Sequence, residues 1–118
     1  MTITPSTLTS LKGTRILVTG STGFKGSWLC TWLTEMGAKI SGFALPPKPD
    51  APLFDQLKLR HRIDQHDGDI RDYSLINDVI KKTKPEVIIH LAAQALVRHS
   101  YQNPKETFDT NVGGGINL

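Results

Sequence analysis

The sequence of 118 residues predicts an α/β fold, a parallel sheet wound with helices on both faces. Short apolar runs rich in β-branched residues alternate with segments of helical periodicity, and the first run ends in a glycine-rich turn. The longest apolar run, 87–93, is only as long as a strand. We expect one domain over residues 1–118, with 1–13 as a flexible N-terminal segment. Its sheet should have about four to five strands in the order 3-2-1-4.

The first half of the chain predicts two strands and one helix. Residues 15–19 form an apolar run of the kind found in strands buried on both faces, and residues 39–44 form the second strand. The helix between them should end at Gly37 and bury one apolar stripe. Prolines between residues 46 and 52 exclude a helix there. The expected stripe consists of Trp28, Leu29, Trp32, Leu33 and Met36.

The second half predicts two more strands, at 63–67 and 86–91, and two helices. Asp72 is expected to cap the helix that ends before Pro85. Its apolar residues are Leu75, Ile76, Val79 and Ile80. The last helix should begin at Asn103, with Pro104 at its first position and Glu106 completing a capping box. Three successive glycines, 113–115, should fray that helix unless they are packed.

Composition excludes several classes of function. The formal charge of +3 is mild and its basic residues are mostly dispersed, so we expect no nucleic-acid partner. No apolar run approaches the roughly 18 residues that cross a membrane, and the N-terminus does not resemble a signal peptide. A cytoplasmic protein is therefore expected. Cys30 is the only cysteine, which excludes an internal disulfide, and four dispersed histidines predict no metal site.

A glycine triplet with the spacing Gly20-x-x-Gly23-x-x-Gly26 stands between the first strand and the first helix. In this position the first glycine makes the tight turn, the second lets a pyrophosphate approach the backbone, and the third lets helix and sheet pack closely. Amides at the start of the helix would face the phosphates. A glycine turn without a ligand is the alternative. Lys25 occupies a position where a Walker loop needs glycine, which excludes that phosphate loop.

Four segments resemble one family. Residues 19–28, TGSTGFKGSW, are similar to the cofactor loop of extended short-chain dehydrogenase/reductases, and particularly to CDP-glucose 4,6-dehydratases. Residues 68–72 (GDIRD), 90–94 (HLAAQ) and 96–101 (LVRHSY) resemble later segments of the same family in the same order. The resemblance runs from about residue 15 to 112 and implies a Rossmann-like domain that binds NAD.

The resemblance also implies the site residues. Asp69 would bond the adenine amine, with Ile70 packed on the ring, although an ordinary turn acid is equally consistent. Gln94 would bond cofactor or substrate, or face solvent. Arg98 would pair with a substrate phosphate or lie on the surface. The expected cofactor-binding residues are Gly20, Thr22, Gly23, Phe24, Lys25, Gly26, Asp69, Ile70, Leu91, Ala92, Ala93 and Gln94.

The choice between NAD and NADP stays open on the residues. NAD sites normally place an acid at the end of the second strand, where it bonds the ribose hydroxyls. Here that strand runs into Leu45 and Pro46, and Asp50 comes only later in the loop. Lys48 could instead attract a 2′-phosphate. The resemblance favours NAD, and NADP is not excluded.

Tyr101 and Lys105 have the Tyr-x-x-x-Lys spacing of the family's proton-transfer pair, but Pro104 should begin a new helix between them. We therefore expect no catalytic residue in this chain and no dehydratase activity from it alone. His90 and His99 have no partner that can be identified from the sequence.

The complete enzyme would use a nucleotide-sugar substrate and form a homo-oligomer. The resemblance implies that it takes a hydride from carbon 4 of the sugar onto NAD, removes water across carbons 5 and 6, and returns the hydride to carbon 6. Alternatives are an epimerase or reductase of the same superfamily, or a non-catalytic module that senses dinucleotides. With no fifth strand beside it, the fourth would be an exposed apolar edge, so we expect self-association or marginal folding.

Overall fold

Four parallel strands form one sheet in a computed structural model that describes residues 10–118. They are β1 (Arg15–Thr19), β2 (Lys39–Ala44), β3 (Asp64–Asp67) and β4 (Val87–His90), in the order β3-β2-β1-β4. The predicted fold and strand order are therefore confirmed. Residues 1–9 of the segment expected to be flexible lie outside the described residues, and Leu11 packs against the core.

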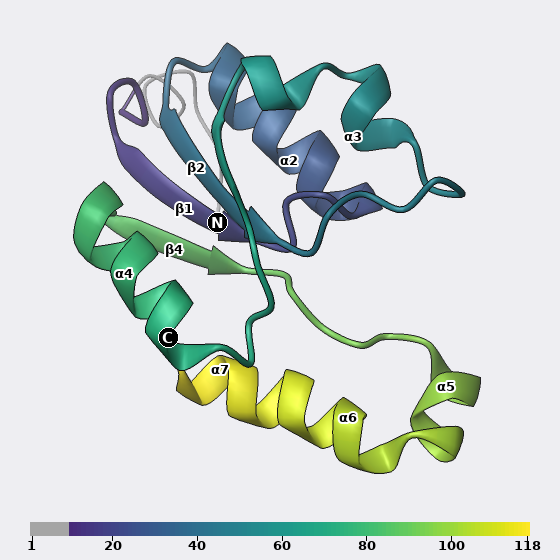
Figure 1. The fold of residues 1–118 in the computed structure, drawn as a ribbon. Coiled ribbons are helices and arrows are strands. Elements are labelled where there is room, and N and C mark those ends of the chain that lie inside the picture. The colour runs from purple at the N-terminus through teal and green to yellow at the C-terminus, as the bar shows by residue number, and fades with distance from the viewer. Residues whose placement is uncertain (1–9) are drawn as a thin grey trace.

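Helices cover both faces of the sheet (Figure 1). One face carries α2 (Phe24–Glu35), α3 (Leu53–Gln56) and the 3-10 turn η1 (Leu59–His61), which pack with Ile16 and Val18 of β1 around one apolar core. The other face carries α4 (Tyr73–Thr83), which packs on Leu17 and Phe43 in a second core. Asp72 caps α4 as predicted, because its carboxylate accepts the Leu75 amide at 3.1 Å. Neither α3 nor η1 was predicted.

The chain after β4 forms a short helix, α5 (Val97–Gln102), and then one longer helical stretch. This stretch consists of α6 (Pro104–Phe108), the π-helical turn η2 (Asp109–Gly113) and α7 (Gly114–Ile116). The glycines do not break it, because Gly114 packs against Ile70: a Cβ added there would lie 2.5 Å from Ile70 Cγ2. Pro104 begins α6 as expected, but the capping box is wrong. Asn103 makes no capping bond, and Glu106 bonds His99 instead.

The predicted apolar stripe of α2 is also partly wrong. Trp28 and Trp32 are 49% and 51% exposed, whereas Cys30 and Leu33 are buried together with Gly26 and Ser27. The cause is the contact between Gly26 and the β1 turn, which rotates the helix so that residues in line with Gly26 face the sheet. Burial raises the pKa of the Cys30 thiol to about 12, consistent with the packing role expected for it.

Candidate functional site

A cavity of about 480 Å³ opens at the carboxyl end of the parallel strands, where such folds bind ligands. It is bounded by the glycine turn after β1, the loop after β2, the turn after β3 and the segment after β4. The structure brings together nine of the twelve residues expected from the sequence: Gly20, Thr22, Gly23, Asp69, Ile70, Leu91, Ala92, Ala93 and Gln94. Phe24, Lys25 and Gly26 do not line it.

The three loop glycines are required for different reasons. Gly20 has a φ of 76°, and a Cβ there would lie 2.8 Å from the Ala92 nitrogen. At Gly26 a Cβ would lie 2.0 Å from the Gly20 oxygen, so α2 packs closely on the turn as predicted. Gly23 has a φ of −78°, which any residue adopts, and its Cβ would meet only the Gly20 oxygen, at 3.4 Å. The fold itself does not demand glycine at Gly23, whereas a ligand in close contact with the backbone would.

Backbone amides without a protein acceptor lie at the start of α2, directly after Gly23. Within residues 10–118, no hydrogen bond joins the N–H groups of Phe24, Lys25 or Gly26 to a protein acceptor, and no side chain caps α2. Together with the positive end of the helix dipole, they form a site suited to phosphate oxygens. The Thr22 hydroxyl donates to the Leu45 carbonyl at 2.7 Å and thereby ties the glycine loop to the end of β2. The arrangement therefore fits the diphosphate of a dinucleotide.

Asp69 lies in the turn after β3 and is bound by its own neighbour. The Arg71 guanidinium donates to both carboxylate oxygens, with Nη2 at 2.6 Å from Oδ2, and the Arg71 amide donates to Oδ1 at 2.9 Å. The side-chain hydrogen bond from Arg71 lowers the pKa of Asp69. Arg71 makes four hydrogen bonds to this carboxylate, which has about four acceptor positions, so an adenine amine would have to share or displace one of them. The buried Ile70 beside it provides the apolar surface expected for the ring.

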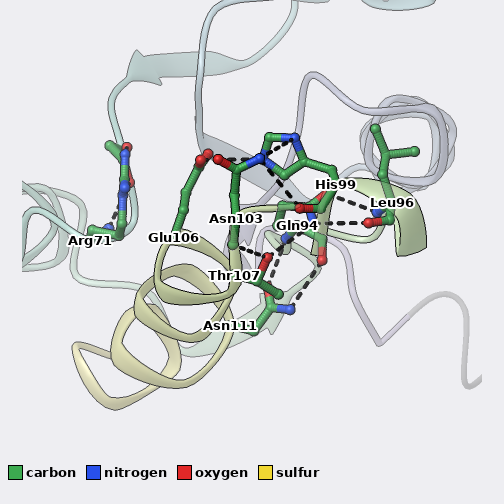
Figure 2. Close-up of polar contacts among 9 residues, drawn as sticks. Arg71, Gln94, Leu96, His99, Asn103, Glu106, Thr107 and Asn111 are labelled. Carbon is green, nitrogen blue, oxygen red and sulfur yellow. Dashed lines mark hydrogen bonds and ion pairs between the residues drawn. The ribbon is translucent and has the colours of Figure 1, made fainter. Parts of the chain in front are cut away.

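Gln94 is held by the protein. Its side-chain nitrogen donates to the Leu96 carbonyl at 3.1 Å and to the Thr107 hydroxyl at 3.3 Å, while its oxygen accepts the Leu96 amide at 2.8 Å (Figure 2). Asn111 bonds both backbone groups of Gln94, at 2.7 and 3.1 Å, from the π-helical turn η2. Gln94 therefore shapes the wall of the cavity, with its bonding groups largely used by the loop itself. Neither Asn111 nor Thr107 was predicted from the sequence as part of this wall.

Thr19, which is fully buried at the end of β1, was missed as well. Its hydroxyl oxygen accepts the amides of Leu91 and Ala92 at 3.1 and 3.2 Å and lies 2.6 Å from His90 Nδ1. A hydroxyl has two acceptor positions and one donor, so its hydrogen must go to His90 Nδ1. Burial lowers the pKa of His90, in agreement with a neutral ring that accepts this bond. Thr19 thus fixes the backbone that passes beside the glycine turn.

His99 and Glu106 form another pair, and both line the cavity. His99 Nε2 of α5 lies 3.2 Å from Glu106 Oε2 of α6, and Figure 2 shows the pair beside Asn103. The sequence showed no partner for either histidine because both partners lie on other elements. Arg98 is exposed and does not line the cavity.

Tyr101 and Lys105 are confirmed to lie on different helices, α5 and α6. The side chain of Tyr101 is 84% exposed, and Lys105 pairs with Asp109. Among residues 10–118, no group of three or more acidic, histidine or cysteine side chains is placed to hold a metal ion. No helix in that range is long and apolar enough to cross a membrane.

Known proteins are similar to this chain in sequence and in fold. The chain is 50% identical over 107 residues to the CDP-glucose 4,6-dehydratase of Salmonella typhimurium, which covers 91% of this chain and 30% of the relative. It is 36% identical over 112 residues to a probable UDP-glucuronate 4-epimerase of Rhizobium meliloti, covering 88% of this chain and 32% of the relative. The chain thus spans about a third of the length of these relatives.

Solved structures of similar enzymes have the same fold as this chain. The UDP-glucose 4-epimerase of Brucella ovis, in complex with NAD, superposes with a TM-score of 0.74 at 27% identity and covers 90% of this chain and 31% of that one. The enzyme from Stenotrophomonas maltophila with bound NAD gives 0.77 at 26% identity, covering 89% and 32%. The model of the GDP-mannose 4,6 dehydratase family matches residues 17–118. Over residues 17–118, therefore, this chain belongs to the GDP-mannose 4,6 dehydratase family.

Proposed function

We propose that the chain is the dinucleotide-binding part of an NAD-dependent nucleotide-sugar 4,6-dehydratase that acts on CDP-glucose. The observation that carries the proposal is Gly23, a glycine that lines the cavity and that the fold itself does not require. The 50% identity to a CDP-glucose 4,6-dehydratase supports the choice of sugar nucleotide, since the probable UDP-glucuronate 4-epimerase is 36% identical.

In this proposal, each wall of the cavity binds a different part of the dinucleotide. The amides at the start of α2 hold the diphosphate, and Asp69 with Ile70 holds the adenine. The small side chains Ala92 and Ala93 leave room for the nicotinamide half. Bound NAD would supply a hydride acceptor, and the residues of this chain bind and orient it.

Turnover is not expected from this chain alone. The one Tyr-x-x-x-Lys spacing, Tyr101 and Lys105, is split between two helices, so the lysine does not lie one helical turn from the tyrosine. We expect dinucleotide binding without conversion of CDP-glucose to CDP-4-keto-6-deoxyglucose. The cytoplasmic location and the homo-oligomeric state of a complete enzyme remain predictions.

The proposal is tested by calorimetric titration of the purified chain with NADH, comparing wild type with Gly23→Ala. The added methyl group would take the space needed by the diphosphate, so binding should weaken at least about tenfold, which is a loss of about 1.4 kcal/mol. Thermal unfolding should change little, since the methyl group meets only the Gly20 oxygen at 3.4 Å.

Gly113→Ala is the matched control, because a Cβ there has no neighbour within 4 Å and does not approach the cavity. It should bind NADH like the wild type. Absence of binding in the wild type, or equal binding by Gly23→Ala, would contradict the proposal.

A further inference from the structure

The turn after β3, which carries Asp69 and Ile70, has two backbone carbonyls that receive no bond from the backbone. Within residues 10–118, no backbone amide donates to the carbonyl oxygen of Ile70 or of Arg71. Ile70 is only 5% exposed, and a buried carbonyl without a donor destabilises the conformation that buries it. The conformation of this turn therefore depends on a donor from another part of the chain.

Asn117, the residue that follows α7, provides this donor. Its side-chain nitrogen donates to the Ile70 carbonyl at 2.9 Å and to the Arg71 carbonyl at 3.2 Å, across 47 and 46 positions of the chain. The nitrogen of a side-chain amide carries two hydrogens, so both bonds can form together. Figure 1 shows α7 ending beside the start of α4, the helix that follows this turn. Between Asn117 and the turn, the hydrogen bonds fix the backbone.

Packing on α7 fixes the side chain of Ile70 as well. Gly114 is buried, and a Cβ added to it would lie 2.5 Å from Ile70 Cγ2 and 3.2 Å from Cγ1. Leu118, next to Asn117, packs against the second core, to which Ile70 belongs. The end of the helical stretch thus contacts Ile70 through both its carbonyl and its side chain, and Ile70 lines the cavity.

Charges on the same helical stretch favour this arrangement. The hydrogen bond to Asp69 is the main cause that raises the pKa of Arg71, and the carboxylates of Glu106 in α6 and Asp109 in η2 raise it further. The cation of the turn is therefore attracted by acids of the stretch that carries Asn117. This attraction supports the contact, whereas the two hydrogen bonds determine its geometry.

We propose that Asn117 is a positioning residue for the adenine half of the dinucleotide, because its two hydrogen bonds hold Ile70 where the ring would pack. The inference rests on the proposed dinucleotide site and adds a residue that does not line the cavity. The glycine loop does not depend on Asn117, since its shape comes from the close contact between Gly20 and Gly26. Loss of Asn117 should therefore impair the adenine half of the site and leave the diphosphate half in place.

The first test is a calorimetric titration with NADH of the wild-type chain, Asn117→Asp and Asn77→Asp. Asn117→Asp keeps the shape of the side chain but replaces the donor nitrogen by an acceptor oxygen, which would face two carbonyls. NADH binding should weaken about fivefold to tenfold, the effect of one to two lost hydrogen bonds. Asn77→Asp is the matched control, since it makes the same change of charge on α4, outside the cavity, and should alter binding less than about twofold.

Amide chemical shifts separate positioning from a general loss of structure. In the ¹⁵N-labelled wild type, saturating NADH should shift the amides of residues 22–26 and those of Asp69 and Ile70. In Asn117→Asp the amides of residues 22–26 should still shift, while the shifts at Asp69 and Ile70 should largely disappear. Asn117→Ala removes the donor without placing a charge beside the carbonyls, so it should give the same pattern even if Asn117→Asp does not fold.

NADH binding like that of the wild type in both Asn117 variants would overturn the inference and leave the dinucleotide site standing. An equal loss of both sets of shifts, or failure of both variants to fold, would show a general structural role and overturn it too. Absence of NADH binding by the wild type would overturn the proposed function itself.

Discussion

The glycine loop and the segment after β4 form two walls of one cavity and hold their shapes by different means. The loop relies on short-range sterics, because Gly20 and Gly26 touch each other six positions apart. The segment after β4 relies on distant partners: Thr19 bonds the Ala92 amide across 73 positions, and Asn111 bonds Gln94 across 17. The loop wall tolerates no added atom at Gly20 or Gly26, whereas a wall built from hydrogen bonds loses its shape when one donor or acceptor is removed.

The largest effect should come from filling the space between the glycines. In Gly26→Ala the new Cβ would lie 2.0 Å from the Gly20 carbonyl oxygen, and neither backbone can move without separating α2 from β1. We expect a loss of about 3 kcal/mol or more in the free energy of unfolding, measured by urea denaturation. If Gly26→Ala were as stable as the wild type, the close contact between Gly26 and Gly20 would not limit the side chain at position 26.

Removing the Thr19 hydroxyl should have the next largest effect. Thr19→Val keeps the shape but leaves the His90 ring and the Ala92 amide without their partner, so we expect a loss of about 2 kcal/mol together with weaker NADH binding. Thr19→Ser should restore most of both. Thr83→Val is the control, because the Thr83 hydroxyl only bonds the Val79 carbonyl within α4. Equal effects of the two valine variants would contradict a special role for Thr19.

These two walls also show how far the sequence could predict the site. The spacing of Gly20, Gly23 and Gly26 predicts the loop, since its geometry depends only on neighbouring residues. The alternation of strands and helices predicts the parallel sheet, and the order 3-2-1-4 is the one expected for a Rossmann-like fold. Asn111 and Thr19 were missed because their partners lie on other elements, and no local pattern marks a hydrogen bond between them. Trp28 and Trp32 misled the prediction of the buried face of α2, because Gly26 decides how that helix is rotated.

A smaller effect should appear on acidification. Burial lowers the pKa of His90 below its ordinary value of 6.5, so the unfolded chain binds more protons than the folded chain around and below that pH. Stability from the neutral ring is therefore present above pH 6.5 and is lost as the pH falls. Chemical denaturation between pH 7.5 and 5 should show a steeper loss in the wild type than in His90→Asn, whose amide oxygen can still accept from Thr19. Identical slopes would mean that His90 does not titrate with folding.

The smallest effect on stability is expected at β4, the strand that precedes the second wall. β4 lies at the edge of the sheet, and its Val87 and Ile88 are 42% and 38% exposed, so the predicted apolar edge is present. Ile88→Lys should reduce self-association in sedimentation velocity experiments with little change in stability. Val97→Lys is the matched control, because Val97 is 71% exposed on α5, away from that edge. If the wild type is monomeric at high concentration, the edge does not drive association.

The central claim is that backbone amides at the start of α2 receive a diphosphate. The most direct measurement is a titration of the ¹⁵N-labelled chain with NADH, followed by amide chemical shifts. We predict that the amides of Thr22, Gly23, Phe24, Lys25 and Gly26 show the largest shifts, and that those of α4 stay in place. Saturable binding that leaves these five amides unchanged would contradict the account.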